Sequence, residues 1–332
     1  MKLRPFTRRD FLTTSAVFGG ATLAPRWTCG ADADRPPAHV AITLDLEMSA
    51  NFPRWEDTHW NFEKGNLDED TKKYAVEVAR QVKARGGAVH FFLVARVLEQ
   101  DDVDWLLGII RDGHRVGNHT YDHVNVKATR PAEIQARFQR APWLIEGQSP
   151  AAIIRENIRL ASAVMKSRLG IEPAGFRTPG GYANGLADRP DVQQMLLELG
   201  FKWVSAKYPA HLNNKPGEET TPEIFASIVQ GQAAAQPFVY PSGLIEVPMS
   251  PISDIGAFRN GRWKLDQFLQ ATRQSLEWAI EHRQVFDFLC HPSCLGVVDP
   301  QFRTIDLICD LVQKAGEDAR FADLETVAGL AR

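Results

Sequence analysis

The sequence predicts an α/β fold in which about seven parallel strands form a barrel. Short apolar runs alternate with amphipathic segments, and no hairpin pattern separates them. The 332 residues are 44% hydrophobic and 24% charged, a balance that excludes collagen-like and disordered chains. A net charge of −3 provides no basic surface for nucleic acid, and four cysteines are too few for a disulfide scaffold. A globular protein with one core therefore remains, and an enzyme fits best.

The first 33 residues have the pattern of an export signal. Arg8 and Arg9 are followed by Asp-Phe-Leu, and residues 11–24 carry no charge. This run is shorter than the roughly 20 apolar residues of a membrane span, so no stable membrane span is expected. Paired arginines before a mildly apolar run predict a twin-arginine signal peptide over residues 1–33 and a periplasmic or secreted protein. Cys29 follows Trp-Thr, a poor context for lipid attachment, so a lipoprotein anchor is not expected.

Residues 38–330 are expected to form one catalytic domain, which begins with a strand. The apolar run at residues 39–45 predicts that buried strand. Residues 68–85 then predict a helix, because apolar residues recur every four positions and Gly86-Gly87 ends the pattern. Pro150 begins a long helix with one apolar stripe.

The same criteria place the remaining elements. Further strands are expected at residues 88–94, 114–118, 174–177, 201–205, 243–248 and 285–290, and further helices at residues 101–112, 190–199, 264–282 and 301–315. Alternating strands and helices favour a parallel sheet with crossover helices. Residues 49–68 and 206–240 are expected to be long loops or insertions. Tyr208, His211 and Tyr240 in the second segment are either substrate contacts or parts of a solvated loop.

Polar residues gather where the predicted strands end, which is the edge at which parallel α/β barrels carry their active sites. The first strand ends in Asp45-Leu46-Glu47. Alternate residues of an extended chain share a face, so the two acids point the same way. Neighbouring carboxylates repel each other unless a cation or a proton lies between them. Taken alone, the pair also fits two solvated acids.

A pair of histidines follows the third strand. His119 and His123 would face one side if their segment forms one helical turn. Imidazole is the commonest ligand of Zn²⁺ and related ions, and the acids at the end of the first strand would complete a set of two histidines and one carboxylate. Such a set leaves positions for water and substrate, as catalytic metal sites require.

Two further segments complete the group. Arg177 ends a strand before a Pro-Gly turn, where the guanidinium can hold a carboxylate and the turn can expose a backbone N–H. His291 ends another buried strand and can donate a proton. Alone, each residue also fits a structural role. Cys290 and Cys294 flank His291 and are expected to be buried and not nucleophilic.

The ordered motifs TLDLE, HTYDH, RTPGG and FLCH resemble the polysaccharide deacetylase family with the NodB-homology domain. The resemblance covers most of residues 39–330, and its most specific part is Gly-Asn-His followed by the second histidine, His123. It implies an irregular (β/α) barrel, similar to a TIM barrel and usually with seven strands. It also implies a metal-dependent hydrolase that removes N- or O-linked acetyl groups from a polysaccharide or peptidoglycan.

The resemblance implies a role for seven residues: the base Asp45, the general acid His291, Arg177 to orient the base, Gly180 as the oxyanion N–H donor, and the metal ligands Glu47, His119 and His123. One divalent metal is expected, with Zn²⁺ as the default and Co, Ni, Fe or Mn also suited to the ligand set. The chain departs from the family at two points. Leu46 separates acids that are usually adjacent aspartates, and Asp254 is the available substitute for the aspartate that usually tunes the acid histidine.

Two other functions remain open. One is an amidohydrolase of the same fold that cleaves a C–N bond of a small or cyclic amide. The other is a catalytically inactive carbohydrate-binding protein, which conflicts with the presence of base, acid and ligands together. Four side chains could line a sugar groove: Trp55, His59, Trp60 and Tyr182. The first three lie in one expected loop, and packing within that loop is an equal alternative for them.

Overall fold

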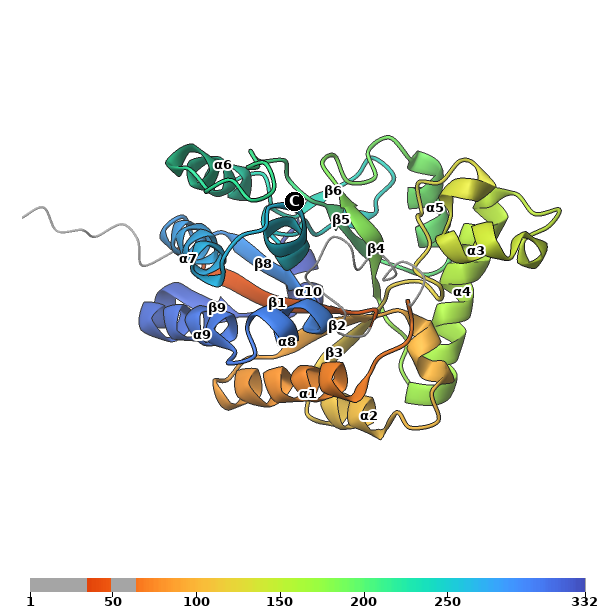
Figure 1. Ribbon diagram of the computed structural model, residues 1–332, viewed down its shortest axis with the longest axis horizontal. Coiled ribbons are helices and arrows are strands. Elements are labelled where there is room, and N and C mark those ends of the chain that lie inside the picture. Colours follow the sequence, from red (N-terminus) through yellow and green to blue (C-terminus); the bar gives the residue numbers. More distant parts are fainter. Residues whose placement is uncertain (1–34, 49–63, 332) are drawn as a thin grey trace, which may run out of the picture. The chain divides into compact units, whose positions relative to one another are not determined.

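The computed structural model describes residues 35–48 and 64–331, and it confirms the α/β class (Figure 1). The sheet has the strand order β6-β7-β5-β4-β3-β2-β1-β8, with β9 beside β1. Every neighbouring pair is parallel except β6 and β7. The strands are β1 (Ala38–Leu46), β2 (Val89–Leu93), β3 (Arg115–Asn118), β4 (Gly175–Tyr182), β5 (Trp203–Lys207), β6 (Phe238–Val239), β7 (Ile245–Glu246), β8 (Val285–Cys290) and β9 (Ala319–Phe321).

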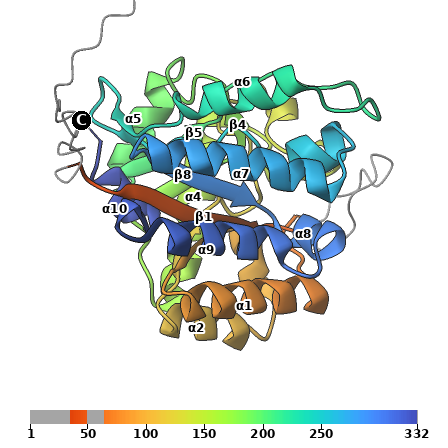
Figure 2. The same cartoon turned by 90° about the vertical axis from the view of Figure 1, so that its left-hand side faces the viewer.

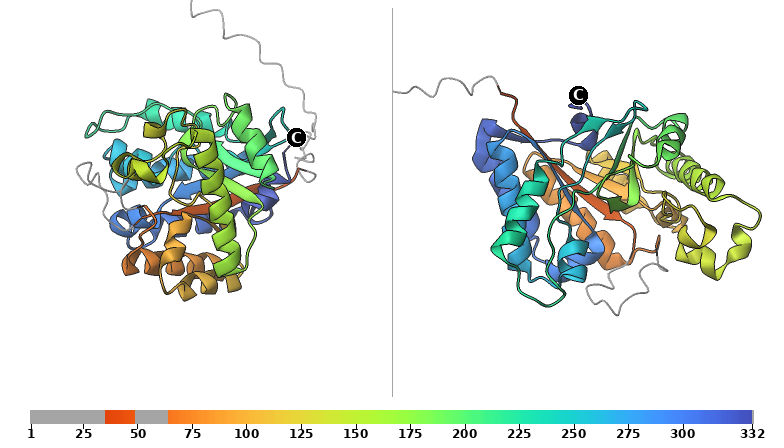
Figure 3. Two further views of the ribbon diagram at one scale, coloured as in Figure 1. Left: turned by 90° about the vertical axis from the view of Figure 1, so that its right-hand side faces the viewer. Right: turned by 90° about the horizontal axis from the view of Figure 1, so that it is seen from above.

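The helices lie outside the curled sheet, as crossover connections of parallel strands require (Figures 1 and 2). They are α1 (Glu69–Ala84), α2 (Asp104–Arg111), α3 (Ala136–Arg140), α4 (Pro150–Leu169), α5 (Pro190–Glu198), α6 (Pro222–Gln232), α7 (Leu265–Glu281), α8 (Pro292–Val298), α9 (Arg303–Ala315) and α10 (Leu324–Ala328). Figure 2 shows α7 and α9 in front of β8 and β1, with α1 below them, and the left-hand view of Figure 3 shows α4 in front on the opposite side. Among the described residues, no helix combines the length and apolar character that crossing a membrane requires.

The predicted helix boundaries follow from their end residues. Asp68 caps α1 by accepting a hydrogen bond from the backbone N–H of Thr71. Ser149 caps α4, and Pro150 occupies the first turn, where its missing N–H has no intrahelical partner to lose. Gly170 ends α4 at a φ of 70°, a left-handed conformation that glycine adopts without strain.

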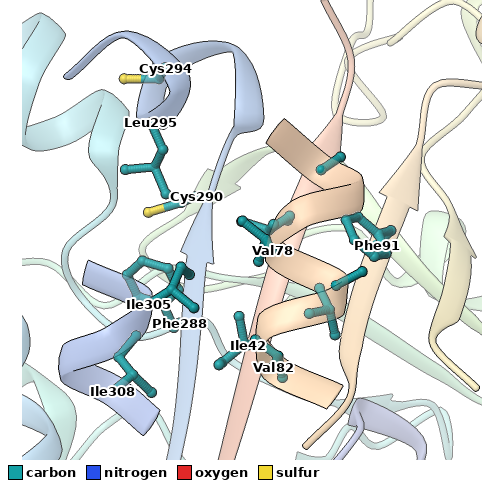
Figure 4. Packing of buried hydrophobic residues seen from close by; sticks show 14 of the residues in the cluster. Ile42, Val78, Val82, Phe91, Phe288, Cys290, Cys294, Leu295, Ile305 and Ile308 are labelled. Atoms are coloured by element: carbon teal, nitrogen blue, oxygen red, sulfur yellow. The ribbon is translucent and has the colours of Figure 1, made fainter. Parts of the chain in front are cut away.

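The main core lies between β1 and the helices α1, α7 and α9. All nine residues of β1 are buried, as expected for a central strand covered on both faces. Val78 and Val82 of α1 belong to one cluster with Ile42 of β1 and Phe91 of β2 (Figure 4). Each such side chain contributes about 1.5–3 kcal/mol to the stability of the fold through burial. The core therefore holds the carboxyl end of β1 in a fixed position.

The segment 206–240 departs from the prediction, because it contains α6 as well as loop. Pro222 starts α6, and Ile224, Phe225 and Ile228 are buried. A short antiparallel hairpin of β6 and β7 follows, in contrast to the expected absence of hairpins. Its turn contains Gly243 at a φ of 91°. Most of the other predicted insertion, at residues 49–63, lies outside the described residues, as does the predicted signal at 1–33.

Hydrogen bonds outside the strand ladder connect the two ends of the sheet. In the segment after β7, the N–H of Val247 donates to Val204 O of β5 at 2.7 Å. Three residues later, the N–H of Ser250 donates to Asp287 O of β8 at 3.0 Å. The sheet is thus a deformed barrel bridged by a single irregular segment. This curvature directs the carboxyl ends of β1, β4 and β8 toward one place.

Candidate active site

A cavity of about 240 Å³ lies at the carboxyl ends of these strands. Its lining includes six residues that the sequence analysis assigned to chemistry: Asp45, Glu47, His119, His123, Gly180 and His291. The seventh, Arg177, lies beneath the cavity and is fully buried. An apolar wall includes Met249, Ile255 and Leu289. The structure therefore brings together every residue of the predicted site.

The acids at the end of β1 share one face, as predicted. β1 remains extended through Leu46, whose side chain belongs to the core cluster. Asp45 and Glu47 on either side of it both line the cavity and are almost completely buried. Two carboxylates buried this closely require positive partners, and the site provides them.

The segment that carries the two histidines does not form the helical turn that the sequence analysis considered. Thr120 and His123 have φ values of 62° and 60°, in the left-handed region. The reason is local: Asn118 Oδ1 accepts the N–H of Thr120, and Thr120 Oγ1 accepts the N–H of Val124. Such side-chain hydrogen bonds replace the backbone bonds of a helix. The imidazole rings nevertheless lie close together, with centroids 5.0 Å apart.

Glu47, His119 and His123 form a donor set that fits a divalent metal ion. One ligand atom from each lies within 4.8 Å of the others. The Nδ1–H of His119 donates to Arg177 O at 2.9 Å, which leaves Nε2 free to act as a ligand atom. Burial lowers the pKa of both histidines, so the neutral form that binds metals is favoured.

Arg177 connects the base position to a second carboxylate. The guanidinium donates to Asp45 Oδ1 at 3.2 Å, to Thr43 Oγ1 at 2.7 Å and to Asp287 Oδ2 at 2.8 Å. It also lies over the ring of Phe92, 4.2 Å from the centroid. Held from several sides, Arg177 can fix the orientation of the Asp45 carboxylate.

Burial raises the pKa of Asp45, while the charges of Arg177 and His291 act in the opposite direction. Burial also raises the pKa of Asp287, to about 6, against the effect of Arg177. A raised pKa makes Asp45 a stronger proton acceptor than a solvated aspartate.

Asp254 holds His291 by two hydrogen bonds. The Nδ1–H of His291 donates to Asp254 Oδ1 at 2.9 Å, and the backbone N–H of His291 donates to Oδ2 at 2.7 Å. Nε2 therefore points the other way and lies 3.1 Å from Glu47 Oε1 and 3.9 Å from Asp45 Oδ2. Burial would lower the pKa of His291, but the carboxylates of Asp254 and Glu47 outweigh it and raise the pKa well above its usual value. The proton on Nε2 is available for donation into the cavity.

Gly180 lines the cavity with a φ of 81°, which a residue with a side chain rarely adopts. Thr178 Oγ1 donates to Gly180 O at 2.7 Å and so fixes the turn. The backbone at this position can therefore face a substrate closely, as the predicted oxyanion role requires.

Lys64 was not identified from the sequence. Its ammonium forms an ion pair with Glu47 Oε2, and its side chain is 1% exposed. Burial would raise the pKa of Glu47, but Lys64, His123 and His291 outweigh it and hold that pKa well below its usual value. Burial lowers the pKa of Lys64 to about 8, against the effect of Glu47.

Residues 59–202 match the family model described as polysaccharide deacetylase. The match covers 144 of the 332 residues and agrees with the resemblance of the ordered motifs to this family. The matched range contains both histidines of the metal set and Arg177, whereas the acids of β1 and His291 lie outside it. No curated protein sequence matches the chain.

Several solved structures have a fold similar to that of this chain. A Mycobacterium smegmatis protein described as a polysaccharide deacetylase is 14% identical, with a TM-score of 0.59 over 90% of this chain and 91% of that one. A protein of the same description from Pseudomonas aeruginosa PAO1 is 14% identical, with a TM-score of 0.58 over 92% and 97%. An allantoinase is 13% identical, with a TM-score of 0.59 over 92% and 96%. At these identities the similarity concerns the fold alone.

The other side chains that the sequence analysis selected as possible substrate contacts have different positions in the structure. Tyr208 lines the cavity, next to His211. The hydroxyl of Tyr240 donates to Glu246, so this residue belongs to the fold and not to the cavity lining. Tyr182 donates to Asn125. Trp55, His59 and Trp60 lie outside the described residues.

The cysteines beside His291 are buried, as predicted. Burial raises the pKa of Cys290 and Cys294 well above the usual value. A thiolate nucleophile is therefore disfavoured at both positions.

Proposed function

We propose that the protein is a metal-dependent hydrolase that removes N- or O-linked acetyl groups from a polysaccharide or peptidoglycan. The observation that carries the proposal is the position of two opposed proton-transfer groups beside one ligand set. Asp45 Oδ2 lies 3.7 Å from His119 Nε2 and 3.9 Å from His291 Nε2. The match of residues 59–202 to the polysaccharide deacetylase family model supports an acetylated glycan as the substrate.

Glu47, His119 and His123 would hold the ion, with Zn²⁺ as the first expectation. When bound, a divalent ion supplies a Lewis acid for the substrate carbonyl and lowers the pKa of water. Asp45 accepts the proton of the attacking water, and Arg177 holds the other oxygen of this carboxylate in place.

The remaining residues act on the two ends of the bond that breaks. The backbone N–H of Gly180 stabilises the carbonyl oxygen as it becomes negative. His291 donates the Nε2 proton to the leaving nitrogen or oxygen, while Asp254 keeps the proton on Nδ1. Addition of water and loss of the C–N or C–O bond yield acetate and the free amine or hydroxyl.

A second candidate function is hydrolysis of a small or cyclic amide. The cavity among the described residues, about 240 Å³, is smaller than the roughly 300–1,000 Å³ common for ligand pockets. A small amide would fit it as well as the acetyl group of a sugar. The same base and acid would serve either reaction, and the similarity to an allantoinase is compatible with both functions.

The experiment combines metal analysis of the purified protein with two substrate panels. Acetate release is measured on acetylated glycans and peptidoglycan, and ring opening on cyclic amides. We expect about one divalent ion per chain and acetate release that depends on it. The His119→Ala and His123→Ala variants should lose both, whereas the exposed His282→Ala should retain both. Full metal content in the His119→Ala and His123→Ala variants would refute the ligand assignment, and turnover of cyclic amides alone would establish the second function.

We also propose export through the twin-arginine route to the periplasm or the exterior, on the pattern of residues 1–33. Replacing Arg8 and Arg9 by lysine should leave precursor in the cytoplasm, as measured by cell fractionation. Normal export of this double variant would contradict the proposal.

A further inference from the structure

Lys64 places a positive charge beside the candidate ligand set, and the proposed reaction does not use it. Its ammonium pairs with Glu47 Oε2. The same oxygen lies 2.5 Å from His123 Nε2. One carboxylate oxygen thus contacts both a ligand imidazole and a lysine. The ammonium and a divalent ion would therefore compete for the charge of Glu47.

The backbone holds Lys64 in this position. The N–H of Gly65 donates to Glu47 O at 2.7 Å, and Arg96 donates to Lys64 O at 3.3 Å. Gly65 has a φ of 86°, and a Cβ at this position would lie 2.3 Å from Arg96 Cβ. The turn therefore requires glycine, and it fixes Lys64 against the end of β1. The ion pair is part of the fold and not a chance contact of a surface lysine.

The charges explain what this arrangement does. A buried carboxylate without a partner is strongly unfavourable, so Lys64 stabilises Glu47 in the metal-free protein. A divalent ion bound at the same carboxylate experiences repulsion from the ammonium, and burial reduces the screening of that repulsion. Lys64 thus lowers the free energy of the metal-free state and raises that of the metal-bound state.

We propose that Lys64 is an internal counter-cation, which positions Glu47 before the metal binds and weakens the affinity of the centre for the ion. It is a positioning residue that acts through Glu47. The inference rests on the proposed function, because it requires the metal centre. The consequence is a preformed site from which the ion exchanges more readily than from the same ligands without the lysine.

The test is metal affinity of the metal-free protein, measured by chelator competition with Zn²⁺ and Co²⁺. Lys64→Met removes the charge and keeps the length of the side chain, and Lys64→Gln provides a second neutral variant. Both should bind the ions at least about tenfold more tightly than the wild type. Lys64→Arg, which keeps the charge, and Lys73→Met on the exposed face of α1 should differ little from the wild type.

Thermal unfolding provides a second readout. In the metal-free form, Lys64→Met should melt below the wild type, and added Zn²⁺ should raise its Tm by more than it raises that of the wild type. A merely structural lysine would give equal or weaker metal binding in both neutral variants, and that result would overturn the proposal. A wild-type protein that binds neither ion would instead refute the metal centre itself, and the inference with it.

Discussion

Two groups of buried carboxylates flank the cavity, and their partners differ in kind. Asp45 and Asp287 share Arg177, and the side chains of Arg177 and Asp287 are 0% exposed. Glu47 instead faces Lys64 and His123, and the His123 side chain is 17% exposed toward the cavity. The first group has a fully buried arginine as its shared partner. The second group can exchange a partner with the solvent, so orientation and ion binding are separated between two neighbouring carboxylates.

The largest effects are expected from variants of Asp45 and Glu47, which test proton transfer and metal binding separately. Asp45→Asn keeps the shape of the side chain but removes the proton acceptor, so turnover should fall roughly 10²–10⁴-fold while metal content is unchanged. Glu47→Gln removes a charged ligand, so metal affinity should fall by more than the roughly 10–100-fold typical of a residue that only supports a ligand. Activity assays and chelator titration on both variants measure the two effects.

The comparison would fail if the two variants behaved in the opposite way. Loss of the metal from Asp45→Asn together with a full metal content in Glu47→Gln would exchange the base and ligand roles of these residues.

A second test concerns only the first group, in which Asp45 and Asp287 share Arg177. Asp287→Asn replaces one acceptor oxygen by an NH2 group, so one buried donor of Arg177 or Thr43 loses its partner and the fold should be destabilised by about 1–3 kcal/mol. Metal affinity should not change, because Asp287 does not belong to the ligand set. Chemical denaturation gives the stability, and Asp310→Asn on the surface is the control. A loss of metal without a loss of stability would show that the two groups are not separate.

Glu246 is a third buried carboxylate to compare with these two groups, because neutral groups and not charged ones donate its hydrogen bonds. It accepts from the N–H groups of Ala206 and Lys207 and from the hydroxyl of Tyr240. Burial raises its pKa from 4.5 to about 7. The folded state therefore binds the proton more tightly than the unfolded state. The resulting stabilisation is complete below pH 4.5 and is lost as the pH rises through 7.

The expected loss is spread over the range between the two pKa values and amounts to at most about 3 kcal/mol. Glu246→Gln should remove it, so the stability difference between variant and wild type should grow in favour of the variant from pH 5 to pH 8. Denaturant unfolding at the two pH values measures this change. Parallel pH profiles for the two proteins would show that Glu246 is already ionised in the fold.

The sequence was sufficient for elements whose pattern and end signals agree. β8 spans the residues predicted for it, since a buried parallel strand is a continuous apolar run bounded by polar residues. α4 begins at Pro150 as predicted. The helix α6 was missed, because its apolar residues lie in a segment rich in Pro, Gly and Gln that resembles a loop.

The candidate site divides in the same way. Its residues were found because each follows a strand and belongs to an ordered motif. The conformation of the histidine segment was not predictable from spacing, because side-chain hydrogen bonds of Asn118 and Thr120 decide it. Asp287 and Lys64 were missed since their importance depends on neighbours distant in sequence. A charged residue within a strand was the available signal for Asp287.

The pairing of β1 with β8 has a consequence for how the protein is made. Thr43 and Asp287 are hydrogen-bonded neighbours that lie 244 positions apart in the chain. At common rates of synthesis, the ribosome needs on the order of 10–50 s to travel this distance. During that time the nascent chain contains Asp45 and Glu47 but lacks β8 and His291, which follow later in the sequence. A chain stalled before residue 285 therefore contains all three candidate ligands, Glu47, His119 and His123, but not His291, the proposed proton donor.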